Sequence, residues 1–532
     1  MKTSMKSNYK SIYISVQEIL YYVFFGLLLF AKGIGLYEGM MSFNICIAFS
    51  LIFITIKLLM TEYTVTEWIG IVAIMLCSII AYLNTGEKAV IITCLTIIGM
   101  KSIPLKRIMK IAFFIWTFTF YGMLIVHLFG WKEEIVLAHN KFGLGFILRH
   151  SLGFPHPNVL HISFVIWMAL FLYLVPKNKK QMMKASIFLL FENIYIFIYS
   201  VSITGFLLGI LYLGLNLYLT SRERKLSAPE KAITMSILPL CIFTSVIPPL
   251  LFQGKLYDIV NKLLNTRLKI WRYYLTTFTP KLFGTKIWSP EEEILSLDCS
   301  YLYLLYYYGI IPFILIMGLF GYVIWNYIQK DGKKELAIIL GMLIAGITEP
   351  YLFNFSFKNI ILLFSGSVLF EVLRKQKGKT ITILPFCNRD LEIKCPDSMN
   401  STIKKIRDAN SHISRKSRTL MTVSGIALGM IVLTISWNSY QKPDHIYVRS
   451  ERCDYVKGDG ITLDDIQREN SLVYGYTDEE TLFYGFDGNM IVLEQIRISI
   501  TGGVLGSFSG VVLFWCILCY NQLMPNRKRE SL

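Results

Sequence analysis

Three short clusters of polar residues carry the chemistry that this sequence could perform. One runs from Arg149 to Asn158, a second surrounds Arg267 and continues to Asp298, and a third begins at Glu349. Arginine side chains bind phosphate, whereas histidine and carboxyl side chains exchange protons. The clusters therefore predict a site in which cations hold an anionic substrate and an acid–base group moves a proton.

The second cluster places a charge on the apolar face of a predicted helix. Between Leu256 and Trp271 the charged residues follow one side of a 3.6-residue repeat, but Arg267 shares the other side with Val260 and Leu264. A guanidinium among apolar side chains loses hydration and needs an anionic partner. We therefore expect an anion to meet Arg267.

Aromatic and basic residues interleave directly after Arg267, at Trp271-Arg272-Tyr273-Tyr274, and the cluster ends at Asp298-Cys299-Ser300-Tyr301. This pattern fits aromatic rings that stack on a sugar beside cations that hold its phosphate. It also fits a helix that lies in the membrane interface, with Arg267 snorkelling past its neighbours to water. Both interpretations stay open on the sequence.

The first cluster ends at Pro157 and Asn158, which are typical of a helix start, where free N–H groups bind phosphate oxygens. The alternative is an ordinary turn with solvated polar groups. Irregular spacing and the lack of partner carboxylates disfavour a metal site among the nearby histidines, so we expect no bound metal. Four of the seven histidines lie in or beside this cluster, namely His139, His150, His156 and His161.

Three residues with proton-exchanging side chains are candidates for a general base: His156, Asp298 and Glu349. The sequence does not rank them. Glu349 stands at the end of an apolar run, with Asn354 shortly after it, and there a carboxylate is either a general base or an exposed charge. The chain has no DxD pair, P-loop, HExxH or GxSxG motif, so we expect no cofactor, ATP-driven transport or proteolysis.

The composition is that of a polytopic membrane protein. Of the 532 residues, 54% are hydrophobic and only 17% are charged, and the mean hydropathy is +0.51. Runs long enough to cross a hydrocarbon core of about 30 Å recur about fourteen times. They lie near 16–32, 42–59, 67–84, 88–104, 108–129, 158–176, 185–200, 203–220, 232–252, 302–327, 335–348, 357–372, 420–437 and 498–520.

The net charge of +17 follows the positive-inside rule. Lysine and arginine concentrate in the short loops on the side of the N-terminus, which places both chain ends in the cytoplasm and the three clusters on the outer face of the cell membrane. Nucleic acid is not needed to explain the charge. Ten cysteines show no disulfide framework, and the one pair in CxxC spacing, Cys516 and Cys519, lies inside an apolar run, where cysteines most often serve as small packing groups.

The composition changes near residue 373, which predicts two modules. Residues 1–372 make about twelve spans with large outer loops at 130–157 and 252–301, and residues 373–419 form a basic cytoplasmic linker. Residues 420–532 make a two-span module that encloses an outer segment, 438–497. In this segment Tyr474 to Gly485 and Asp487-Gly488-Asn489 predict short strands with tight turns.

Glycines recur four residues apart in both spans of the second module. Such stripes let helix backbones approach closely, so these spans pair with each other or with another subunit. The alternative is that glycine is simply common in membrane helices. The glycines are Gly425 and Gly429 in one span and Gly502, Gly506 and Gly510 in the other.

Taken in order, the clusters resemble those of Wzy-type polysaccharide polymerases of capsule and exopolysaccharide pathways. The residues that carry the resemblance are the Arg149-to-Asn158 run, Asn265-Thr266-Arg267, Leu282-Phe283-Gly284, Asp298 to Leu305 with Tyr308-Gly309-Ile310-Ile311, and Glu349 with Asn354. The match covers about residues 1–372. It implies an all-α bundle of the lipid-dependent glycosyltransferase type (GT-C-like) with an amphiphilic outer cavity.

The resemblance also implies an enzyme that joins oligosaccharide repeat units carried on undecaprenyl pyrophosphate, without a metal. In such an enzyme Arg149 and Arg267, with Arg272, would hold the pyrophosphate, and the sugar path would be lined by Asn158, Trp271, Tyr301 and Asn354. A chain-length regulator or a flippase of the same pathway is an expected partner.

Three other functions stay open. A ligase would move a finished glycan to a wall, lipid or protein acceptor with the same arginines. A flippase for the same lipid-linked units would need charged residues deep in many spans, and Glu192 is the sole acidic residue well within one. A structural role would use the second module to recruit assembly partners.

Overall fold

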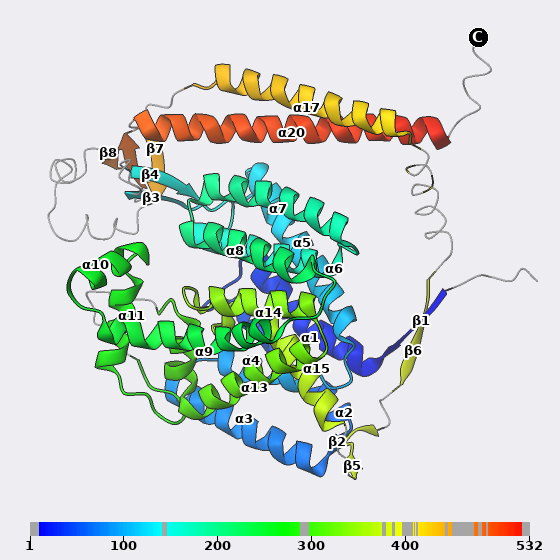
Figure 1. Cartoon of the computed structure of the whole chain (residues 1–532), viewed down its shortest axis with the longest axis vertical. Helices are drawn as coiled ribbons and strands as arrows, with labels where there is room; N and C mark the ends of the chain where they lie inside the picture. Colours follow the sequence, from blue (N-terminus) through cyan, green and yellow to red (C-terminus); the bar gives the residue numbers. More distant parts are fainter. Residues whose placement is uncertain are drawn as a thin grey trace, which may run out of the picture. The chain divides into compact units, whose positions relative to one another are not determined.

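The structure is a computed structural model that describes residues 10–132, 134–140, 146–287, 297–374, 379–385, 389–395, 408, 410, 413–441, 445–449, 473–476, 481–485 and 488–523. By its contacts the chain forms two compact units (Figure 1). The larger unit holds residues 15–134 and 151–390. The smaller unit holds residues 1–14, 135–150 and 391–532, so the outer loop expected at 130–157 is divided between the two.

Eleven helices of the described chain are long and apolar enough to cross a membrane, which confirms an all-α multi-pass membrane protein. Nine belong to the larger unit: α1 (Val16–Gly33), α2 (Met41–Met60), α3 (Val65–Thr85), α5 (Leu105–Leu128), α6 (Pro157–Leu174), α7 (Lys179–Ser200), α8 (Ile203–Thr220), α9 (Ala228–Leu251) and α13 (Ile310–Gln329). The smaller unit supplies α17 (Arg415–Asn438) and α20 (Gly488–Leu523).

Three further expected spans are shorter helices of the larger unit. They are α4 (Ala89–Gly99), α14 (Lys333–Ala345) and α15 (Ile361–Leu373). All three are surrounded by other helices, since α4 packs on α3 and α15, and α14 packs on α8 and α9. A helix enclosed by protein need not match the thickness of the lipid, which accounts for their length.

Helix starts in the larger unit are fixed by side-chain caps. Ser15, Asn178 and Ser202 each accept a hydrogen bond from a backbone N–H in the first turn of α1, α7 and α8. Thr64 forms a capping box with Glu67 at the start of α3. These caps satisfy donors that lipid or protein would otherwise leave unpaired. The starts of α1, α3 and α8 lie within two residues of the expected runs, whereas α7 begins at Lys179, six residues before the run expected from 185.

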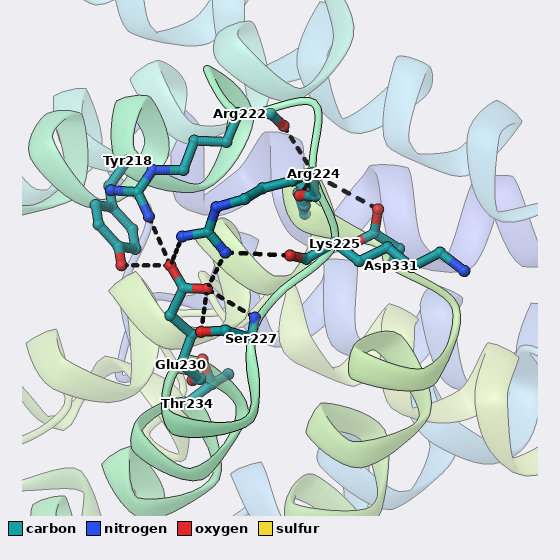
Figure 2. Close-up of polar contacts among 9 residues, drawn as sticks. Tyr218, Arg222, Arg224, Lys225, Ser227, Glu230, Thr234 and Asp331 are labelled. Atoms are coloured by element: carbon teal, nitrogen blue, oxygen red, sulfur yellow. Dashed lines mark hydrogen bonds and ion pairs between the residues drawn. The ribbon is translucent and has the colours of Figure 1, made fainter.

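Ion pairs tie helices together at the end of the bundle where α1, α3, α5 and α9 begin. Glu18 meets Arg107 at 2.8 Å, and Glu67 meets Lys101 at 2.5 Å. Figure 2 shows the largest such group, in which Glu230 accepts hydrogen bonds from Arg222, Arg224, Ser227 and Tyr218. This end of the larger unit is therefore closed by charge pairs.

The segment around Arg267 is two helices, not the single helix expected between Leu256 and Trp271. The chain turns after α10 (Gly254–Leu263) and starts again as α11 (Arg267–Thr277). Asn265 and Thr266 make the turn with φ of 53° and 67°, a conformation that costs free energy for a β-branched residue. The helix α10 buries no residue and has opposite apolar and charged faces, which suits a membrane interface.

Two of the motifs that carry the family resemblance meet each other. The amide of Ile310 donates to the carbonyl of Lys281, and that of Ile311 donates to Leu282. A Cβ on Gly309, whose φ is 100°, would lie 2.3 Å from the amide nitrogen of Gly284, so only glycine fits there. This contact holds the short α12 (Ser300–Tyr303) and the π-helical turn η1 (Leu304–Tyr308) that precede α13.

Four small β-sheets supplement the helices, whereas the sequence predicted strands only within the segment 438–497. In the larger unit β2 (Tyr63–Thr64) pairs with β5 (Thr380–Ile381). The other strands are β1 (Lys10–Ser15) with β6 (Asp390–Cys395), β3 (Val136–Asn140) with β4 (Phe146–His150), and β7 (His445–Arg449), β9 (Thr481–Gly485) and β8 (Val473–Tyr476) in that order. The strands expected between Tyr474 and Gly485 are confirmed, but Gly488, expected in a turn, begins α20.

In the smaller unit α17 runs along α20 as an antiparallel hairpin (Figure 1). The glycine stripes face each other: a Cβ on Gly506 would lie 2.8 Å from Val432, and one on Gly510 would lie 3.1 Å from the Cα of Gly425. Of the two alternatives for the stripes, pairing of these spans with each other is confirmed.

Replacing Gly429 by leucine should separate this hairpin, because a Cβ there would lie 1.8 Å from Ser507 Oγ and 2.7 Å from the carbonyl oxygen of Gly503. The test is a disulfide between cysteines placed at Ser436 and Gly502, whose Cβ positions are 3.3 Å apart, near the spacing of a disulfide. We expect oxidation to form the crosslink in the parent protein and to fail in the Gly429→Leu variant. Gly318→Leu, where a Cβ meets nothing within 4 Å, is the matched control; equal crosslinking in both variants would contradict the close packing.

Candidate functional site

The structure brings Arg267, Asp298 and Glu349 together in the larger unit. An Arg267 Nη lies 3.4 Å from Glu349 Oε1 and 3.8 Å from Asp298 Oδ2. Arg267 is 6% exposed. The expectation that a buried Arg267 meets an anion is confirmed, and the partners within the protein are two carboxyl groups from segments far along the chain.

Backbone contacts around Ser300 join the two carboxyl segments. Ser300 Oγ donates to the carbonyl of Glu349 at 2.6 Å and accepts from the amide of Leu352 at 3.2 Å. The amide of Ser300 donates to Gly346 O at 2.8 Å. The start of α12 is thus fastened to the turn between α14 and the 3-10 turn η2 (Pro350–Leu352), which fixes the distance between Asp298 and Glu349.

The two carboxyl groups share one guanidinium, and this changes the acidity of Glu349. Burial raises the pKa of Glu349 to about 7; Arg267 opposes that shift, and the neighbouring Asp298 adds to it. Glu349 lies between membrane-spanning segments. Its carboxyl group can therefore hold or release a proton near neutral pH, which is what a general acid or base requires.

Two donors on the same face of α11 lack an acceptor among the described residues. They are Arg267 Nε and the indole nitrogen of Trp271, and both are buried. Residues four apart are neighbours on a helix surface, so these donors lie one turn from each other. A buried donor without an acceptor costs about 1–3 kcal/mol. This face of α11 therefore fits a ligand that brings acceptor oxygens.

Asp298 also lines a pocket of about 570 Å³. Segments from four parts of the larger unit surround it, and every one of them lies at the end of the bundle opposite the ion pairs of Figure 2. Its polar residues are Lys32, Glu38, Asp298, Asn354 and Ser356, and its aromatic residues are Tyr37, Tyr274, Tyr303, Tyr307 and Phe355. Aromatic rings among carboxyl and amide groups suit a carbohydrate, whose C–H faces stack on rings while its hydroxyls bond the polar groups.

The π-helical turn η1 shapes the aromatic side of the pocket. Tyr303 and Tyr307 stack with their centroids 4.3 Å apart, and the Tyr303 hydroxyl donates to Glu87. Tyr306 and Tyr308 leave the same turn in another direction and donate to the carbonyls of Tyr274 and Phe353. Such irregular turns are frequent at functional sites because they present side chains that a regular helix would hide.

Other expected site residues have structural contacts instead. Arg272 donates from Nε to Pro249 O at 2.5 Å, donates to Phe252 O, and lies 4.0 Å from the Tyr257 ring centroid, so it caps the end of α9. Tyr301 is 1% exposed and donates to Leu343 O at 2.7 Å. Neither of them, nor Trp271, is among the pocket-lining residues.

His156 and Asn158 lie at the start of α6, as expected. His156 Nδ1 accepts from the amide of Asn158 at 3.0 Å and so serves as the N-cap of the helix. This contact uses one ring nitrogen for structure. Neither residue is among those that line the pocket.

Arg149 belongs to the smaller unit, where it stands opposite Leu137 in the β3–β4 hairpin and is 3% exposed. Its neighbour His150 meets Glu494 at 3.1 Å, and Arg497 also pairs with Glu494 and donates to Leu148 O at 2.7 Å. These contacts attach the hairpin to α20. That Arg149 and Arg267 hold one diphosphate stays a prediction.

Several pocket residues were not expected from the sequence, above all Lys32, Glu38 and the tyrosine pair. Lys32 stands at the end of the first apolar run, where a lysine is typical of the membrane interface and draws no notice. The signal in the sequence that could have identified these residues is that they all lie at span ends that share one side of the bundle. The described residues contain no group of three or more His, Cys, Asp or Glu side chains that could hold a metal ion.

Comparison with protein-family models, with curated proteins and with solved structures found no match to this chain. The site is therefore interpreted from its own geometry.

Glu349 should make the stability of the protein depend on pH. Because burial raises its pKa from about 4.3 to about 7, the folded state keeps the proton to a higher pH than the unfolded chain does. Stability should therefore fall as pH rises from about 4.5 to about 7, by at most about 3 kcal/mol. Thermal unfolding of the purified protein and of Glu349→Gln, compared at pH 5 and pH 8, tests this. The stability of the variant should fall less between these pH values, because it lacks the Glu349 carboxyl group.

Arg267→Met provides a second arm of the same measurement. Loss of the guanidinium removes the interaction that opposes the rise in the pKa of Glu349, so the decline in stability should move to higher pH. Parallel pH profiles for all three proteins would contradict a shared site for these groups.

Proposed function

We propose that the chain is a metal-independent glycosyltransferase that polymerises oligosaccharide repeat units carried on undecaprenyl pyrophosphate. The reaction takes place on the outer face of the cell membrane, with both chain ends in the cytoplasm, and the product is a capsular or exopolysaccharide. The observation that carries this proposal is the buried Arg267 between two carboxyl groups, one of which opens into a pocket lined by aromatic rings.

In this reaction a hydroxyl oxygen of the acceptor unit attacks the anomeric carbon of the donor glycan. The bond from that carbon to the pyrophosphate oxygen breaks, and the lipid pyrophosphate leaves with the electron pair. The hydroxyl proton passes to a carboxylate. Since the donor already carries a good leaving group, the protein has to position two lipid-linked substrates and stabilise negative charge.

Asp298 is the candidate base best supported by the pocket, because it lines the pocket and its side chain is one-third exposed. Glu349 lies behind it on the same guanidinium and, with a pKa near neutral, can exchange a proton with the site. His156, which caps α6, has less support. Tyr303, Tyr307 and Asn354 are placed to contact the sugar rings.

Arg267 contributes by holding the carboxyl groups and, together with Trp271, by a donor that faces no acceptor in the described part of the chain. Arg267 Nε and the Trp271 indole supply hydrogen bonds that an oxyanion of the substrate can accept. A lipid-dependent fold of this type also accounts for a polar pocket at one end of an otherwise apolar bundle. A partner role for the smaller unit, with a chain-length regulator or a flippase, is part of the proposal.

Reconstitution with lipid-linked repeat units tests the proposal. The purified protein should make a ladder of products, and Arg267→Ala should slow it about a hundredfold or more, corresponding to about 3 to 4 kcal/mol of transition-state stabilisation. Asp298→Asn should have a comparable effect, and Arg149→Ala tests the second expected arginine. Arg107→Ala is the matched control, since Arg107 also pairs with a carboxylate but at the opposite end of the bundle.

The outcomes separate the alternatives. A ladder that Arg267→Ala and Asp298→Asn leave unchanged would reject the roles given to these residues. A single transfer of finished glycan to another acceptor would identify a ligase, and movement of the lipid-linked unit across the membrane without bond formation would identify a flippase.

A further inference from the structure

Lys32 is the one ammonium group among the described residues that line the pocket. It stands in the last turn of α1, at the end of the bundle where the pocket opens. Arg267 and Asp298 approach the pocket from α11 and from the start of α12, whereas Lys32 belongs to a helix more than two hundred residues earlier in the chain. The larger unit thus offers a second cation beside the site already described.

The Lys32 ammonium is positioned by aromatic rings. Its Nζ lies 4.0 Å from the ring centroid of Phe43 and 5.5 Å from that of Phe355, and these two rings meet edge to face. In the described chain no hydrogen bond or ion pair joins Lys32 to a carboxylate, but the charges of Glu38, which lines the same pocket, and of Glu87 act on it at longer range. A ring face attracts a cation without neutralising it, so the ammonium keeps its charge for a ligand.

The contrast with Arg267 defines what each cation does. Arg267 already faces two carboxyl groups, and its charge is largely offset within the protein. Lys32 has a fixed place at the pocket and, in the described chain, forms no ion pair with the carboxylates that act on it from farther away. An anionic group that enters this pocket therefore meets Lys32 as the one cationic side chain among the described residues that line it.

We infer that Lys32 is the residue through which this pocket binds an anionic group of its ligand, either the diphosphate of a lipid carrier or the carboxylate of an acidic sugar. The inference rests on the proposed function for the kind of ligand. Tyr303 and Tyr307 would then stack on the adjoining sugar ring, and Asn354 would bond its hydroxyls.

Binding measurements on the full-length protein in nanodiscs test this assignment. The probes are farnesyl diphosphate with farnesol as its neutral counterpart, and D-glucuronate with D-glucose. The wild type should bind the anionic member of at least one pair more tightly, and which pair responds identifies the source of the anion. Lys32→Met should weaken that binding about tenfold to a hundredfold, while Lys32→Arg should keep most of it.

Lys88→Met is the matched control. Lys88 stands at the same end of the bundle, donates to Asn44 at 3.4 Å and does not line the pocket. Unchanged affinity in Lys32→Met, or an equal loss in Lys32→Met and Lys88→Met, would overturn the inference.

A second measurement needs no variant. Acetylation of lysines in the wild type, followed by peptide mass spectrometry, should show Lys32 protected by the bound anionic probe and Lys88 unprotected. Equal labelling of Lys32 with and without probe would overturn the inference even if Lys32→Met failed to fold. Because these readouts measure binding alone, the assignment can succeed without a product ladder, and a ladder can form without it.

Discussion

The buried guanidinium of Arg267 is the constraint on which the pocket end of the larger unit depends. Its removal from water is compensated only because Asp298 and Glu349 reach it from segments that lie next to α12 and after α14. Because three segments meet at the Arg267 guanidinium, the loops around the pocket are held together. Ser300 completes the closure by bonding the carbonyl of Glu349 and the amide of Leu352, and apolar residues of the same loops, among them Leu297 and Phe353, are buried in the core.

One guanidinium cannot fully neutralise two carboxylates in a place with little water. The raised pKa of Glu349 reflects this imbalance, because the protonated carboxyl group carries no charge. The backbone also departs from its preferred geometry nearby, in the turn at Thr266. At the opposite end of the bundle, Glu230 accepts hydrogen bonds from several donors in an exposed cluster (Figure 2). The donors there balance the charge of the carboxylate, and the cluster closes a turn.

The sequence predicted the features that follow from periodicity and from the cost of burying charge. Apolar runs located the membrane helices, the face of Arg267 predicted an anionic partner, and the glycine spacing predicted that α17 and α20 pair. It missed features that depend on tertiary contact. The helix break at Thr266 contradicts the continuous helix that the apolar stripe predicted. Arg272 was predicted to bind phosphate but caps α9. Lys32 has the sequence position of an interface lysine, and only the fold places Phe43 and Phe355 beside it.

Lys32, which lines the pocket, and Arg267, which pairs with the pocket residue Asp298, differ in a way that bears on how a charged lipid could enter and leave. A site whose every cation is unpaired would hold a diphosphate too tightly to release it, whereas a site whose every cation is paired would not attract one. Here Arg267 pairs with two carboxyl groups, whereas Lys32 contacts ring faces and interacts with Glu38 and Glu87 only at longer range, so the attraction is limited to one charge. Protonation of Glu349 changes that balance, because a neutral Glu349 leaves Arg267 opposed by Asp298 alone and raises the net charge at the site. Transfer of a proton to Glu349 during the proposed reaction would therefore strengthen the hold on negative charge at the moment the leaving group develops it.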